Sequence, residues 1–93
     1  MQESIGPKDE KARKKAEKEV KKQEKLVKNI RGKKQAIEKD KLKISKFQSK
    51  LAKDRSKGKL SPVDEMKLNN KINKLQLNIA KNKEKLTKLE RKQ

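Results

Sequence analysis

The chain has 93 residues, of which 31 are Lys or Arg and 13 are Asp or Glu, so its formal net charge is +18. Hydrophobic residues make up 28% of it, Phe47 is its single aromatic residue, and Cys and His are absent. This composition excludes an ordinary globular core, because apolar burial must outweigh the ordering entropy, and it excludes disulfide scaffolds, zinc fingers and thiol enzymes.

The first predicted element is a long helix over roughly 8–56. Pro7 suits a first helical turn, and the acids Asp9 and Glu10 that follow it suit the positive end of a helix dipole. Almost every residue from there to Ser56 is a helix former, and no segment alternates apolar with polar residues as a strand would.

Gly32 is the one glycine inside this segment, and it leaves two arrangements open. It either kinks one continuous helix or ends a first helix, which would give a three-helix bundle of 8–30, 34–56 and 62–92. We favour the continuous helix, because the bundle leaves half of the last helix without a neighbour unless the first helix folds back onto it.

A tight turn near 57–61 separates the first helix from a second one over roughly 62–92. Gly58 suits the left-handed residue that ends many helices. Ser61, Pro62 and Asp64 then supply an N-cap, a proline in the first turn and an early acid. These three residues are the strongest local signal in the chain.

Each predicted helix carries an apolar line with heptad spacing. Leu26 supports this line in the first helix. If the helices are antiparallel, the numbers of facing residues have a constant sum, and four pairs add up to 116, for example Ile44 with Ile72 and Ile37 with Ile79. This agreement predicts an all-α, coiled-coil-like antiparallel two-helix hairpin over 26–93. Its predicted helix–helix interface consists of Val27, Ile30, Ile37, Ile44, Phe47, Leu51, Leu68, Ile72, Leu75, Ile79, Leu86 and Leu89.

The predicted interface also contains polar residues. Lys34 is expected to face Asn82 in a polar layer that sets the register, and Asp40 and Lys41 to lie against Leu75. With about ten buried aliphatic side chains at roughly 1.5–3 kcal/mol each, a lone hairpin is marginal. We therefore expect self-association or a larger protein complex to complete the fold.

Residues 1–25 form a predicted helical arm that extends beyond the reach of the second helix. Its nine bases and six acids nearly balance. Pairs such as Asp9 with Arg13 and Glu17 with Lys21 stand at i,i+4 and would stabilise an exposed helix. We interpret the arm as a solvated helix that frays at its start.

The excess positive charge follows a regular pattern in the rest of the chain. Lysines recur at steps of three and four along both helices, which places them at heptad positions c and g if Ile37 and Ile72 are a. Since position g of one antiparallel helix lies beside g of the other, both rows are expected on one flank. This lysine stripe consists of Lys39, Lys43, Lys46, Lys50, Lys53, Lys57, Lys67, Lys71, Lys74, Lys81, Lys85, Lys88 and Lys92.

The lysine stripe predicts an anionic partner, and nucleic acid is the polyanion that we favour. Lysine outnumbers arginine 27 to 4, and Phe47 is assigned to the interface, so we expect contacts to the phosphate backbone with little sequence specificity. The function predicted is that of an accessory or assembly component of a nucleoprotein complex. The alternative is a coiled-coil adaptor that docks on an acidic protein.

Other function classes are disfavoured by missing residue types. Without His, Cys or a glycine-rich phosphate loop we expect no enzyme, no cofactor and no metal site. We also expect no membrane partner, because no apolar run approaches a span and the apolar faces are used between the helices. The N-terminus lacks a signal-peptide core, so the expected location is intracellular, either cytoplasmic or at the nucleoid or nucleus.

Overall fold

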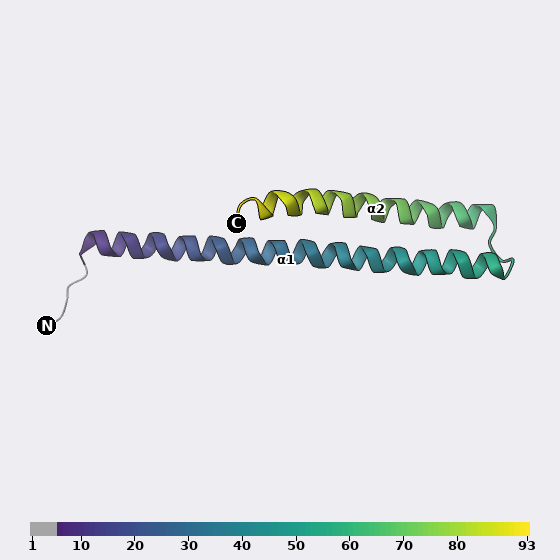
Figure 1. Cartoon of the computed structure of the whole chain (residues 1–93), viewed down its shortest axis with the longest axis horizontal. Coiled ribbons are helices and arrows are strands. Elements are labelled where there is room, and N and C mark those ends of the chain that lie inside the picture. The colour runs from purple at the N-terminus through teal and green to yellow at the C-terminus, as the bar shows by residue number, and fades with distance from the viewer. Residues whose placement is uncertain (1–5) are drawn as a thin grey trace.

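The computed structural model describes residues 6–93 and consists of two helices, α1 (Pro7–Ser56) and α2 (Pro62–Glu90). α2 runs back beside the second half of α1, and the first half of α1 extends beyond it (Figure 1). The molecule is a rod of 85 × 22 × 15 Å. The predicted all-α hairpin is therefore confirmed, with no strand among residues 6–93.

The helix ends form where the local sequence signals predicted them. Gly6 is the N-cap of α1, and Gly58 takes a φ of 65° just after its end, in the left-handed region that favours glycine. The Ser61 side chain accepts a hydrogen bond of 3.1 Å from the backbone N–H of Asp64 and so caps α2. Residues 57–61 form the link, as predicted.

α1 continues through Gly32 without a break, so the three-helix bundle is excluded. An added Cβ at Gly32 would meet no heavy atom within 4 Å. Gly32 therefore lies in the helix although no neighbouring atom is close enough to exclude a side chain at this position.

The helices pack along one apolar seam. Ile30, Ile37, Leu51, Leu68, Ile72 and Ile79 are all less than 10% exposed. Around Leu51, Leu68 and Ile72, the half-buried Ile44, Phe47 and Leu60 complete a cluster next to the link. Leu60 had not been predicted in the interface, although an apolar residue in a short link is a signal for it. The remaining predicted members, Leu75, Leu86 and Leu89, are half-buried.

Two predicted interface positions are wrong by one residue. Val27 is 43% exposed, while Leu26 is half-buried. Lys34 is likewise exposed, and Lys33 is the half-buried residue one turn from Ile30 and Ile37. The heptad explains both differences. Counted back from Ile37 at position a, position d falls at residues 33 and 26, whereas residues 34 and 27 fall at position e, on the flank. The expectation that Lys34 faces Asn82 in the seam is therefore wrong.

The other polar expectations at the seam hold in part. Asn82 and Asp40 are half-buried, but Lys41 is exposed. Lys41 instead turns to Glu38 on its own helix, with 3.4 Å between its Nζ and Glu38 Oε1. No polar or charged side chain is buried among the described residues.

The arm is the part of α1 that α2 does not cover. Every residue from 8 to 25 is exposed, and Leu26, which follows them, is half-buried. The first five residues of the arm predicted over 1–25 lie outside the described residues. Below, "arm" means residues 7–25 and "hairpin" means residues 26–93.

Candidate nucleic-acid interface

Three grooves between the helices show how the two rows of lysine are arranged. One, next to the link, is lined by Lys50 from α1 and by Lys67 and Lys71 from α2. A second lies near the far end of α2, where Asn29 and Gly32 of α1 meet Lys85 and Lys88. The third brings Lys22 and Lys25 of α1 beside Lys92.

All of these residues occupy heptad positions c or g. The grooves therefore lie along one side of the hairpin, which we call the lysine flank. Members of the lysine stripe from both helices line the groove next to the link, so at that point the structure brings the two rows together. The other stripe lysines are exposed on the same heptad positions.

Two carboxylates interrupt the lysine flank at the link end. Asp54 and Asp64 line the same groove as Lys50, Lys67 and Lys71. Asp64 stands three residues before Lys67, at the stripe position g, so its spacing was visible in the sequence. These acids lower the local positive potential, and the strongest uncompensated charge therefore lies farther from the link.

The seam and the lysine flank meet at Phe47. The Nζ of Lys71 lies 5.7 Å from the centre of the Phe47 ring, which is a cation–π distance. The methylene stem of Lys71 can cover the edge of the apolar cluster while its charge remains exposed. The contact gives the hairpin one specific tie between a stripe lysine and its core.

Most stripe lysines carry charge that no neighbouring acid neutralises. Within residues 6–93, Lys88 is the stripe member found in an ion pair, at 4.0 Å from Glu84. The side chains of this pair are about 70% exposed, so water screens most of the attraction. The flank thus presents a row of free ammonium groups.

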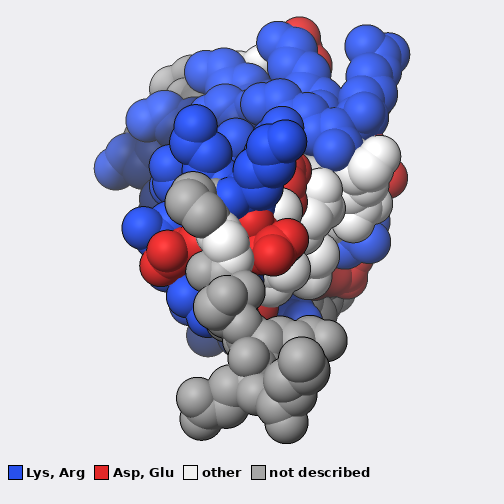
Figure 2. Space-filling model, turned by 90° about the vertical axis from the view of Figure 1, so that its left-hand side faces the viewer, with Lys and Arg blue, Asp and Glu red and all other residues white. Residues whose placement is uncertain are grey.

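The opposite flank differs in composition. Its positions b and e hold mainly Ser, Gln, Asn, Ala and Thr, such as Ser45, Gln48, Asn73 and Gln76. Figure 2 looks along the molecule from the arm end: Lys and Arg cover the top and much of the left, and most uncharged side chains in sight gather on the right. Positive charge is therefore unevenly distributed around the rod.

Other kinds of site find little support in residues 6–93. No three acidic side chains gather there into a potential metal site. Neither helix is long and apolar enough to cross a membrane. Comparison of the chain with protein-family models, with characterised proteins and with solved structures gives no match.

Proposed function

We propose that this protein is a non-enzymatic nucleic-acid-binding protein that lays its lysine flank along the phosphate backbone. Within a larger nucleoprotein assembly it would act as a rigid accessory rod. The observation that supports this best is the lysine flank itself, whose stripe lysines are exposed, with Lys88 the one found in an ion pair among the described residues. Like charges held together in this way repel each other unless a polyanion neutralises them.

The kind of base defines the mode of binding. An ammonium group contacts phosphate as a point charge, whereas reading guanine uses the planar fork of arginine. The one aromatic ring, Phe47, is packed in the seam beneath Lys71 and offers no platform for an unpaired base. We therefore propose binding that depends on charge and has little sequence specificity.

Charge reversal on one flank tests the proposal. The variant Lys39→Glu, Lys46→Glu, Lys74→Glu and Lys81→Glu should abolish binding to a duplex in an electrophoretic assay, because it changes four contiguous phosphate contacts into repulsions. A matched control reverses four exposed bases at positions b and e, on the opposite flank, and should keep most of the affinity. These control residues are Arg31, Lys34, Lys41 and Lys83.

Equal losses in the two variants would show that net charge alone drives binding and would contradict the proposal. A salt titration gives a second measure. If about six phosphates are engaged, the log of the binding constant should fall against the log of the salt concentration with a slope near −5. A slope near zero would eliminate a backbone contact.

The second candidate is a coiled-coil adaptor that docks on an acidic protein or on a second copy of this chain. It is supported by the large apolar side chains that stay exposed, with fractions of 43–64%. For an adaptor, reversal of stripe lysines should be tolerated, while Leu42→Asp or Leu77→Asp, which charge exposed apolar side chains, should abolish the association. The residues that support it are Val20, Val27, Leu42, Val63, Met66 and Leu77.

A further inference from the structure

The arm has a lysine row of its own. Lys8, Lys11, Lys15, Lys18, Lys22 and Lys25 recur at steps of three and four. Counted back from the hairpin, these are again heptad positions c and g, the same as in the lysine stripe. Because α1 is one unbroken helix from Pro7 to Ser56, the two rows share one face of it.

The lysine row of the arm stays on the same side of α1 as the lysine stripe, although α2 does not lie beside the arm. A straight α-helix drifts by about 20° per heptad against a seven-residue repeat, so the row turns by about 50° over the length of the arm. It therefore remains on the side of the lysine flank. A groove on the arm, lined by Lys11, Lys15 and Lys18 together with Ala12 and Lys14, lies on this face.

Between the two rows of α1, three stripe positions hold Asn29, Gly32 and Ala36 instead of lysine. This is the stretch where α2 supplies the bases: Lys85 and Lys88 line a groove of about 530 Å³ with these three residues. Lys92 then lies beside Lys22 and Lys25 at the start of the arm. The positive surface thus passes from α1 to α2 and back to the arm.

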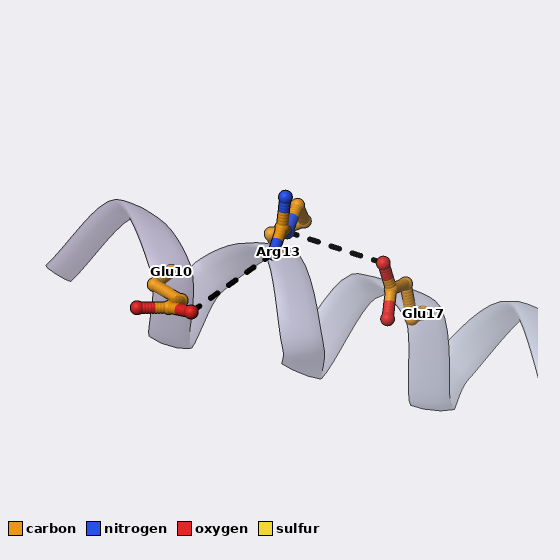
Figure 3. Close-up of polar contacts among 3 residues, drawn as sticks. All are labelled: Glu10, Arg13 and Glu17. Carbon is orange, nitrogen blue, oxygen red and sulfur yellow. Dashed lines mark ion pairs between the residues drawn. The ribbon is translucent and has the colours of Figure 1, made fainter. Parts of the chain in front are cut away.

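Three of the five acids of the arm lie away from its lysine row, whereas Glu19 lies beside it. Glu10, Glu17 and Glu24 recur at steps of seven, at position b. Arg13 lies between the first two, with 4.0 Å from its guanidinium nitrogens to each carboxylate (Figure 3). Within the described arm, Lys22 is the one member of the lysine row in an ion pair, at 3.9 Å from Glu19.

The near balance of charge over residues 1–25 therefore hides a separation of charge. On one side Glu10 and Glu17 are paired with Arg13, and on the other the ammonium groups of the lysine row are free apart from that of Lys22. A solvated helix stabilised only by i,i+4 pairs would have no reason to keep six of its nine bases on the same face as those of the hairpin.

We infer that the arm is the outer part of the nucleic-acid-binding surface, and that one duplex is contacted along the whole length of α1. This inference rests on the proposed function. At 1.5 Å per residue α1 is about 75 Å long, against about 46 Å for its part within the hairpin. At 3.4 Å per base pair these lengths correspond to about 22 and about 14 base pairs.

Duplex length is the variable that tests the inference on the full chain. Wild type should bind a duplex of about 24 base pairs more tightly than one of about 14, beyond the statistical gain from extra sites. The variant Lys11→Gln, Lys15→Gln and Lys18→Gln should lose this difference, and its salt slope should be shallower by up to about 2.7. Circular dichroism checks that the arm stays helical, as expected because Gln and Lys have similar helix propensities.

Two controls separate the possible causes. Arg31→Gln, Lys34→Gln and Lys41→Gln remove the same charge from the opposite flank and should leave the length dependence intact. Lys→Arg at positions 11, 15 and 18 keeps charge and helix propensity and should retain wild-type behaviour.

The outcomes distinguish failure of the inference about the arm from failure of the proposed function. If the Gln variant of the arm binds both duplexes as wild type does, the inference is overturned while the proposed function stands. If the opposite-flank control loses as much as the arm variant, the face of the arm is irrelevant and the inference also fails. If wild type binds neither duplex, the proposed function itself is wrong.

Discussion

The arm and the hairpin are parts of one helix that are stabilised in different ways. In the hairpin, α1 is held by burial against α2, with Ile30 and Ile37 only 6% and 5% exposed. In the arm every side chain from residue 8 to 25 is exposed, and the helix depends on propensity and on local ion pairs. The comparison shows that a similar lysine-rich composition supports a helix with and without a tertiary partner.

The arm gains from its continuity with the hairpin. Starting a helix is costly, and isolated helices shorter than about 12–15 residues are marginal in water. Here the hairpin has already formed the turns from which the arm continues, so the arm needs only propagation. Its outer end is expected to fray first, while the hairpin unfolds as a unit.

The largest expected effect is loss of the hairpin on placing a charge in the seam. Ile72 is 7% exposed, and Ile72→Asp leaves an unpaired buried carboxylate that costs about 3–5 kcal/mol. We expect the cooperative urea transition, followed by circular dichroism, to disappear. Leu77→Asp is the control on the same helix, since Leu77 is 61% exposed. A retained transition in Ile72→Asp would mean that burial does not hold the hairpin.

The next effect concerns the link, where the hairpin depends on one backbone conformation. Gly58 has a φ of 65°, and Gly58→Ala should lower the free energy of unfolding by about 1–2 kcal/mol, because a Cβ disfavours the left-handed region. Space is not the reason, since an added Cβ would meet nothing within 4 Å. Urea denaturation measures the loss, and an unchanged midpoint would contradict the role given to this glycine.

The same substitution inside α1 should act in the opposite direction. Gly32 is helical and has open space around its Cα, so Gly32→Ala should raise the free energy of unfolding by about 0.5–1 kcal/mol. Gly32 lies within the hairpin, so urea denaturation of the hairpin measures the gain. A loss of stability instead would show that α1 needs flexibility at this position.

The smallest expected effects are those of single ion pairs, and they should separate the two regions. Arg13→Gln removes two ion-pair contacts of 4.0 Å within the arm. It should destabilise the arm helix by about 0.2–0.5 kcal/mol per pair and so reduce its helicity slightly. Arg55 reaches Glu65 across the link at 2.9 Å, so Arg55→Gln should lower the free energy of unfolding of the hairpin, by about 0.2–1 kcal/mol.

Amide hydrogen exchange on these two variants resolves the regions residue by residue. Arg13→Gln should speed exchange within residues 8–25 alone, and Arg55→Gln should act on the hairpin. If Arg13→Gln also shifted the urea midpoint, the arm and the hairpin would be one cooperative unit and the comparison would fail.

Much of the fold was predictable because its signals are local. Pro7, Gly58 and the Ser61–Pro62 start act through the backbone of their own neighbours, and all of them are found at helix ends as expected. The direction of the hairpin followed from the constant sum of facing residues. The choice of Val27 over Leu26 was wrong because Val27 was matched with Leu89 by the constant sum, whereas the heptad phase decides which side chain points at the partner.

The candidate site was predictable in its pattern and less so in its detail. The steps of three and four placed the lysines on one flank of each helix. That Asp54 and Asp64 share a groove with Lys50 and Lys67 depends on how the link brings the two helix ends together. The continuation of the stripe into the arm was present in the spacing, but the overall balance of charge over residues 1–25 obscured it.

Two helices, the link between them and the faces on which lysines and aliphatic residues recur could all be derived from the sequence, because helix caps and helical periodicity operate over a few residues. Packing of the two helices was needed to establish that α1 stays continuous through Gly32 and that bases from α2 fill the gap in the row of α1. These are outcomes of packing, since they depend on where a partner helix ends and on which side it lies.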